Sequence, residues 1–169
     1  FYKESKFGIK DLLIFNNKIY ISYSNLLKDY GYGRHHDNCY NTSILVANLN
    51  FDKLNFEKFY TPKDCASKKN DYGFFNPHHS GGRMVNLKDK IIFTHGDYKI
   101  RKSAQDDKSE FGKIIEINQD GTFSRFLSKG HRNPQGLYFD NENNILLSTE
   151  HGPDGGDEVN IVEIDNNEI

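Results

Sequence analysis

Three copies of one strand–turn–strand pattern constrain the fold of this chain more than any other feature. Each copy has a short apolar strand, a polar turn and a longer strand in which apolar and polar residues alternate. The copies begin at Ile9 (IKDLLIFNNKIYISYSN), Gly81 (GGRMVNLKDKIIFTHGD) and Pro134 (PQGLYFDNENNILLSTEHG). A third strand follows each copy (SILVANL, GKIIEIN and EVNIVEID), and a fourth follows the first two (LNFEKFYT and TFSRFL). Repeated four-stranded antiparallel units are typical of a β-propeller, in which each blade is one such sheet.

The expected architecture is therefore an all-β chain that forms part of one propeller. We predict four-stranded antiparallel blades in a partial β-propeller domain that spans residues 1–169, with blades at approximately 8–62, 80–128 and 134–169. A β-sandwich also consists of many short strands and is the competing architecture. The repeated order of strands favours the propeller.

Two further expectations make this architecture specific. Gly136–Asp140 and Ile145–Glu150 should be neighbouring strands of one sheet, because a polar turn joins two apolar runs. The polar stretches 63–73 and 99–110 lack apolar periodicity, so both are expected to be loops. Long loops that leave the same ends of strands commonly shape a binding site.

Composition agrees with a strand-rich fold and narrows the function classes. Aromatic residues make up 14% of the chain, with 10 Tyr and 13 Phe, which favours strands. A formal charge of −2 gives no electrostatic argument for nucleic acid as a partner. No apolar run approaches the roughly 18 residues that a membrane span needs. The chain begins at Phe1 rather than at Met, which suggests a processed or partial piece of a longer protein.

The segment Gly130 to Glu158 carries the most specific chemistry. Arg132 and Asn133 lie in a turn before one strand of a short hairpin, and a glycine-rich loop with several acidic residues follows the other strand. A guanidinium group suits a polyanionic cofactor, and an oxygen-rich loop suits a hard metal ion.

A second candidate site lies in the middle copy of the repeat. His79 precedes the first strand of that copy and Asp97 follows the second strand, so antiparallel pairing should bring the two residues together. A carboxylate beside an imidazole fixes its tautomer and raises its basicity, as a general base requires. A purely structural hydrogen bond explains the same spacing and, from these residues alone, is the favoured reading. His78 and His95 lie close by and are expected to be surface or packing residues.

These motifs resemble the soluble quinone-dependent glucose/sorbosone (aldose sugar) dehydrogenase family, whose cofactor is pyrroloquinoline quinone (PQQ). The resemblance is strong over GHRNPQGLYFDNENNILLSTEHGPDGGDE and moderate between His79 and Asp97. It implies that His79 is the catalytic base, that Asp97 supports His79, and that Arg132 and Asn133 contact the quinone.

The same resemblance implies a calcium site beneath the cofactor. Backbone carbonyl groups and an acidic pair would bind the ion; these residues are Gly152 and Pro153, and Asp157 and Glu158, respectively. In this family a propeller of six blades is expected, of which about half is present here. A lysine that pairs with the cofactor belongs to a later blade, so the isolated fragment is expected to be inactive and prone to self-association.

The activity implied by the resemblance is oxidation of an aldose at its anomeric carbon to a lactone, with hydride transfer to PQQ assisted by calcium. A small-molecule sugar would be the substrate, an external electron acceptor would reoxidise the cofactor, and the protein would be periplasmic or secreted. Two alternatives stay open: a non-catalytic propeller that binds a sugar or a protein, and a calcium-dependent hydrolase of the lactonase type.

Cys39 and Cys65 are expected to form a disulfide bond. Strands at 42–49 and 54–61 should form a hairpin that turns near Phe51 and Asp52, which places the two cysteines opposite each other at its open end. A disulfide requires Cα atoms within about 7 Å. Such a bond would suit an oxidising compartment.

Overall fold

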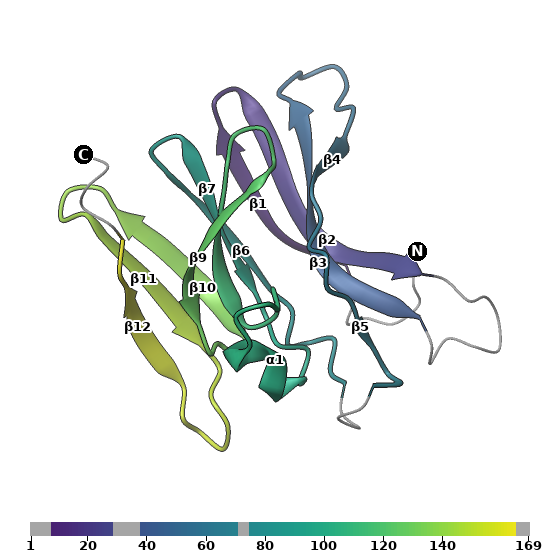
Figure 1. Cartoon of the computed structure of the whole chain (residues 1–169). Helices are drawn as coiled ribbons and strands as arrows, with labels where there is room; N and C mark the ends of the chain where they lie inside the picture. Colours follow the sequence, from purple (N-terminus) through teal and green to yellow (C-terminus); the bar gives the residue numbers. More distant parts are fainter. Residues whose placement is uncertain (1–7, 29–37, 71–74, 165–169) are drawn as a thin grey trace.

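A computed structural model describes residues 8–28, 38–70 and 75–164. Antiparallel strands dominate these residues, in three sheets that succeed one another along the chain (Figure 1). The first sheet contains β1 (Ile9–Phe15), β2 (Lys18–Lys28), β3 (Cys39–Asn48), β4 (Glu57–Tyr60) and β5 (Ala66–Ser67). The second contains β6 (Gly81–Leu87), β7 (Lys90–His95), β8 (Lys113–Ile117) and β9 (Phe123–Lys129). The third contains β10 (Pro134–Asp140), β11 (Ile145–Glu150) and β12 (Glu158–Val162).

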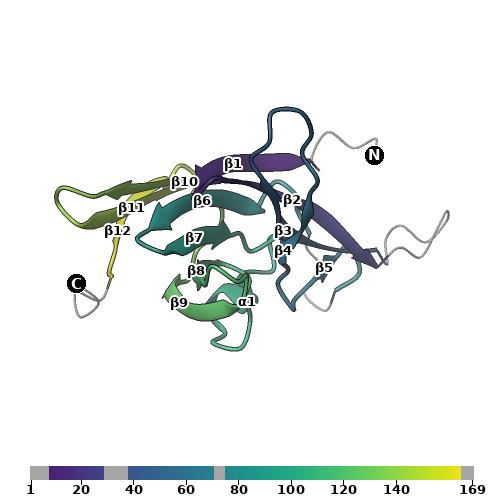
Figure 2. The same ribbon diagram turned by 90° about the horizontal axis from the view of Figure 1, so that it is seen from above.

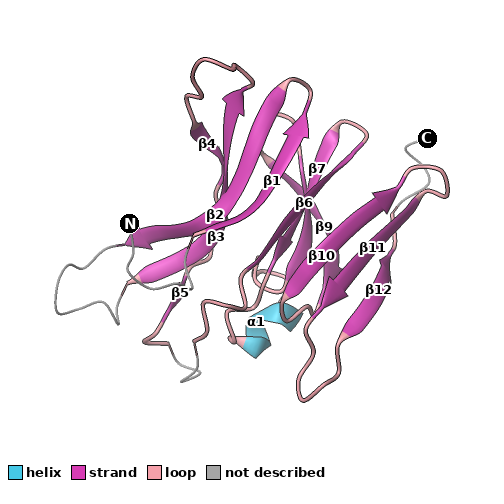
Figure 3. Ribbon diagram, turned by 180° about the vertical axis from the view of Figure 1, so that it is seen from behind, coloured by secondary structure: helices cyan, strands magenta, loops and turns pink. Residues whose placement is uncertain are grey.

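The sheets are arranged as successive blades of a β-propeller. Each sheet is a meander, with the strand orders β1-β2-β3-β4, β6-β7-β8-β9 and β10-β11-β12, and β5 pairs with β3. The first strand of the second sheet, β6, lies between β1 and β10, and the later strands extend away from this inner row (Figures 2 and 3). The all-β propeller predicted from the repeats is confirmed.

Packing of the middle sheet between the two others rules out a sandwich with one shared core. On β7, Ile91 and Phe93 pack with residues of the first sheet, whereas Ile92 packs with Leu146 and Val162 of the third. The middle sheet is therefore buried on both faces, which explains why KIIFT and KIIEI are nearly continuous apolar runs instead of alternating ones.

The two outer sheets each leave one apolar face exposed. Leu12 and Ile14 of β1 are exposed on one side of the molecule, and Val159 and Ile161 of β12 are 74% and 73% exposed on the other. Exposed apolar patches of this kind normally mark a surface that another structure covers.

The register of the third sheet agrees with the sequence. Leu137 pairs with Ser148 and Asp140 with Ile145, so Gly136–Asp140 and Ile145–Glu150 are neighbouring antiparallel strands, as predicted. The last five residues of the predicted third blade, 165–169, lie outside the described residues.

The disulfide between Cys39 and Cys65 is present, with a Cα–Cα distance of 5.4 Å. The bond forms as the hairpin argument predicted, although the residue directly opposite Cys39 is Ser67 of β5, two positions after Cys65. The expectation of a loop over 99–110 was wrong in one part, because Arg101–Gln105 forms the short helix α1. Its buried side chain is Ala104, and the carbonyl groups of Ser103 and Ala104 accept hydrogen bonds from the ammonium group of Lys113 at 3.0 and 2.9 Å.

Among the described residues, no helix has both the length and the apolar character required to cross a membrane.

Candidate active site

Four strand ends meet at the edge of the sheets beside α1. His79 precedes β6, Asp97 follows β7, Arg132 precedes β10 and Gly152 follows β11. Antiparallel order explains this meeting, because the start of one strand lies beside the end of its partner. Gly81 pairs with His95, and Pro134 pairs with Glu150.

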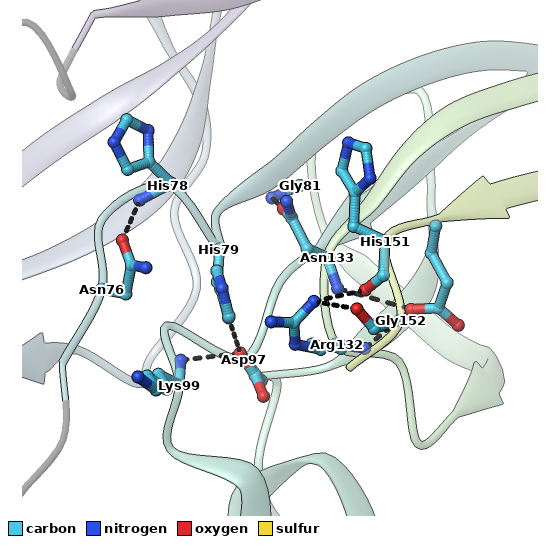
Figure 4. Close-up of polar contacts among 11 residues, drawn as sticks. Asn76, His78, His79, Gly81, Asp97, Lys99, Arg132, Asn133, His151 and Gly152 are labelled. Atoms are coloured by element: carbon cyan, nitrogen blue, oxygen red, sulfur yellow. Dashed lines mark hydrogen bonds and ion pairs between the residues drawn. The ribbon is translucent and has the colours of Figure 1, made fainter. Parts of the chain in front are cut away.

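His79 and Asp97 form a buried pair at this edge. Nδ1 of His79 lies 3.1 Å from Oδ1 of Asp97, and the two residues are 7% and 2% exposed. The same Asp97 oxygen accepts a hydrogen bond from the backbone N–H of Lys99 at 2.6 Å. An ionised Asp97 can only accept hydrogen bonds, so Nδ1 of His79 is the donor in this contact and Nε2 is the ring nitrogen left for another partner. The predicted contact between these residues is thus confirmed (Figure 4).

The backbone around Asp97 is held in an unusual conformation. Tyr98 and Lys99 have φ angles of 49° and 71°, in a region of backbone conformation that few residues other than glycine adopt. A Cβ atom on Gly96 would lie 2.2 Å from the carbonyl oxygen of His79, so only glycine allows this close approach. The N–H of Tyr98 donates to that same oxygen at 2.9 Å. Local strain here is stabilised by surrounding contacts and places the Asp97 carboxylate against His79.

His78 and His95 have the roles expected of surface and packing residues. The side chain of His78 is exposed and points away from Asp97, on the opposite side from His79 (Figure 4). His95 is fully buried, with Nε2 accepting from the N–H of Thr42 at 3.3 Å and Nδ1 lying 2.9 Å from the carbonyl oxygen of Glu110. Both nitrogens of His95 are therefore engaged, and neither faces the His79–Asp97 pair.

Burial lowers the pKa of His95 to about 4, although its hydrogen bond to Glu110 and the charge of Asp64 act in the opposite direction. In the unfolded chain a histidine has a pKa of about 6.5, so between pH 6.5 and 4 the unfolded state binds more protons than the folded state. The contribution of neutral His95 is complete above pH 6.5 and is lost as the pH falls toward 4.

We expect the free energy of unfolding to fall by about 2 kcal/mol between pH 7 and pH 5 because of His95. Urea unfolding at a series of pH values measures this slope. His95→Gln, which retains a donor and an acceptor, should flatten it, whereas the exposed control His78→Gln should leave it unchanged. Equal slopes for His95→Gln and the unaltered chain would contradict the assignment.

Arg132 and Asn133 are bonded directly to the segments that carry the His79–Asp97 pair. The carbonyl oxygen of Arg132 accepts from the N–H of Asp97 at 2.9 Å. Oδ1 of Asn133 accepts from the N–H of Gly81 at 3.2 Å. Hydrogen bonds therefore join this turn to both segments, although each lies far from it in the sequence.

The guanidinium group of Arg132 is only partly satisfied by the chain. Nη1 donates to the carbonyl oxygens of His151 and Gly152 at 2.8 and 2.6 Å. Nε is buried and has no hydrogen-bond partner among the described residues. A buried donor without an acceptor is costly in a folded protein and is an expected feature of a site that receives an anionic or carbonyl-rich ligand. The donor chemistry of Arg132 thus fits a quinone that carries carboxylates.

His131 and Glu150 support this turn, and neither was assigned a role from the sequence. Nδ1 of His131 lies 3.0 Å from Oε1 of Glu150, and Oε2 accepts the N–H groups of Arg132 and Asn133 at 2.7 and 3.4 Å. Burial raises the pKa of Glu150, but the bond and charge of His131 and these two N–H groups outweigh burial and leave its pKa below the ordinary value. The hairpin register that pairs Pro134 with Glu150 was the sequence signal that could have revealed this contact.

The loop from Gly152 to Glu158 is compact and carries only oxygen donors. A Cβ atom on Gly152 would lie 1.6 Å from the carbonyl oxygen of Gly156, so the loop closes tightly on itself. Asp157 accepts from the N–H of Gly152 at 3.1 Å, and the carbonyl oxygen of Pro153 accepts from the N–H of Gly156 at 3.0 Å. Oε2 of Glu158 accepts from Asn160 at 3.3 Å.

These donors fit calcium in their chemistry, since that ion takes carboxylate and carbonyl oxygens. In the described part of the chain, however, no three His, Cys, Asp or Glu side chains are grouped as metal ligands, and the Gly152 oxygen faces Arg132. Beside the loop is a hollow of about 230 Å³ that is lined by Gln135, Thr149, Glu150, His151, Asp157, Glu158 and Val159. The acidic pair Asp157 and Glu158 therefore borders an open space.

An imidazole paired with a carboxylate, a guanidinium with an unpartnered Nε and an oxygen-rich loop thus lie at neighbouring strand ends. Comparison with known proteins shows the class of protein to which this chain belongs. The Glucose / Sorbosone dehydrogenase family matches residues 14–167, so the chain belongs to this family.

Individual relatives support the same assignment. The chain is 35% identical over 97 residues to the aldose sugar dehydrogenase YliI of Escherichia coli, an alignment that covers 49% of this chain and 26% of the relative. It is 30% identical over 115 residues to the quinoprotein glucose dehydrogenase B of Acinetobacter calcoaceticus, covering 50% of this chain and 24% of the relative.

Among solved structures, the chain is similar to the apo form of the soluble aldose sugar dehydrogenase of Escherichia coli. The TM-score is 0.77 at 26% identity, and the match covers 96% of this chain and 48% of the other. The chain thus spans about half the length of that structure, and it aligns with about a quarter of each curated relative.

Proposed function

We propose that this chain forms about half of a quinoprotein that oxidises an aldose at the anomeric carbon to a lactone. The observation that carries the proposal is the direct bonding between the His79–Asp97 pair and the Arg132–Asn133 turn. A base and a cationic binding group are thereby held at one site, as a sugar dehydrogenase with an anionic cofactor requires. Membership of the family and the name of the Acinetobacter relative support the quinone.

The residues of this chain have separate tasks in that reaction. His79 accepts the proton of the anomeric hydroxyl at Nε2, while Asp97 holds the tautomer and stabilises the imidazolium that forms. Arg132 binds an oxygen of the cofactor through its free donors, and Asn133 orients the same turn. Bound PQQ would supply the redox chemistry by accepting the hydride from the anomeric carbon.

The proposal includes a calcium ion at the loop after β11. The carbonyl oxygens of Gly152 and Pro153 and the carboxylates of Asp157 and Glu158 are the groups that would hold it. A carbonyl oxygen has two lone pairs, so the Gly152 oxygen can accept from Arg132 and still face a cation.

The setting of the enzyme follows from the same reasoning. We propose that residues 8–62, 80–128 and 134–169 are three blades of a larger ring, whose further sheets cover the exposed faces of β1 and β12. The Cys39–Cys65 disulfide supports a periplasmic or secreted location, since such bonds persist in oxidising compartments. An external electron acceptor would reoxidise the cofactor.

The test is to express the protein from its complete gene, to add PQQ and calcium, and to follow aldose oxidation with a redox dye. Reduction of the dye that depends on both quinone and sugar supports the proposal, and its absence in a folded, quinone-saturated protein contradicts it.

The 169-residue chain alone should turn over sugar poorly in the same assay, because a cofactor enclosed by several blades loses much of its site when sheets are absent. Its two exposed apolar faces should also make it self-associate, which light scattering would detect. Turnover equal to that of the complete gene product would overturn this expectation.

A further inference from the structure

The carboxylate of Glu150 is the acceptor around which the Arg132–Asn133 turn is built. Oε2 receives both backbone N–H groups of the turn, at 2.7 and 3.4 Å, and Oε1 receives His131 at 3.0 Å. The Glu150 side chain is 7% exposed, so water has little access to these bonds. Two consecutive backbone N–H groups that donate to one buried carboxylate would lose their hydrogen bonds without it.

His131 and Asn160 hold the carboxylate in place from two sides. Nε2 of His131 lies 2.8 Å from Oγ of Ser128, so both ring nitrogens have partners and the ring cannot rotate freely. Nδ2 of Asn160 lies 3.4 Å from Oε1 of Glu150 and 3.3 Å from Oε2 of Glu158. Glu150 is therefore connected both to the turn that precedes β10 and to the acidic loop that precedes β12.

We propose that Glu150 and His131 are positioning residues that hold the Arg132–Asn133 turn in the conformation that binds the cofactor. Arg132 reaches the His151 and Gly152 carbonyls only while its own backbone is fixed, and Glu150 is the side chain that fixes it. The identity of the ligand rests on the proposed quinone function. The clamp, by which we mean the hydrogen bonds from the N–H groups of Arg132 and Asn133 to Glu150, is argued from the contacts alone.

The first measurement needs neither a variant nor a quinone. Hydrogen exchange, followed residue by residue, should show the amides of Arg132 and Asn133 to be protected, although both precede the first strand of their sheet. Exchange at the rate of exposed amides would overturn the proposal. Because this measurement uses the chain without cofactor, it decides about the clamp even if PQQ does not bind.

The second measurement is PQQ binding to the protein expressed from the complete gene. Glu150→Gln keeps the shape of the side chain but removes the charge and turns one acceptor into a donor, so PQQ should bind about tenfold more weakly. His131→Ala should weaken binding in the same direction, and the double variant should lose less than the product of the two single losses.

Glu116→Gln is the matched control, because Glu116 of β8 is also a buried carboxylate. It accepts hydrogen bonds from Ser124 and Arg125 of β9 at 2.7 and 3.1 Å. It should leave PQQ affinity unchanged. A Glu150→Gln protein that folds, keeps both amides protected and binds PQQ as the unaltered protein does would overturn the proposal. If the unaltered protein does not bind PQQ, the proposed function fails, and the exchange measurement still decides about Glu150.

Discussion

Replacing His79 with Ala is expected to lower sugar turnover by roughly 10²-fold or more in the protein expressed from the complete gene, which is the usual scale for loss of a general base. In the proposed mechanism Nε2 of His79 accepts the proton, since Nδ1 is directed at Asp97 at 3.1 Å. PQQ binding should survive, because the contacts of Arg132 with His151, Gly152 and Glu150 do not involve His79. Steady-state rates and quinone titration separate the two effects.

His78→Ala is the matched control for this prediction. His78 is the neighbouring residue, but its side chain is exposed and lies on the opposite side of the chain (Figure 4). Asp97→Asn should reduce the rate as well, because an amide no longer stabilises the imidazolium. Equal losses in the His78 and His79 variants, or full activity without His79, would show that another residue is the base.

The repeats predicted the fold because strand pairing in a propeller is local. Within each sheet, apart from β5, each strand pairs with the next one along the chain, so the order of apolar runs is also the order of strands. The same locality made the His79–Asp97 contact and the Cys39–Cys65 bond predictable from hairpin register.

Other features depend on contacts that sequence spacing does not show. Helix α1 has little apolar periodicity. Two of its carbonyl groups accept hydrogen bonds from Lys113, a buried residue of β8. The turn at Tyr98 and Lys99 uses backbone conformations that favour glycine, so neither residue type predicts it. In the sequence, nothing distinguishes Glu150 from the other acidic residues near the loop after it. The hairpin register places its carboxylate beside the N–H groups of Arg132 and Asn133.

Reduction of the Cys39–Cys65 disulfide is expected to lower the free energy of unfolding by about 3 kcal/mol. The bond joins residues 26 positions apart, and a cross-link of that span removes considerable freedom from the unfolded chain. Urea unfolding with and without a reductant, with thiol titration to confirm reduction, measures the change. The Cys39→Ser, Cys65→Ser double variant is the control, since a reductant should not affect it further.

The effect of reduction should extend from the disulfide toward the site. Asp64, next to Cys65, accepts hydrogen bonds from Oγ of Ser109 and from the N–H of Glu110 at 2.5 and 2.7 Å. The carbonyl oxygen of Glu110 in turn lies 2.9 Å from Nδ1 of His95, which ends β7 two residues before Asp97. Reduction should therefore increase hydrogen exchange at 106–111 more than in β10 and β11. An unchanged unfolding midpoint in fully reduced protein would mean that these loops, and not the covalent bond, hold this edge of the first sheet.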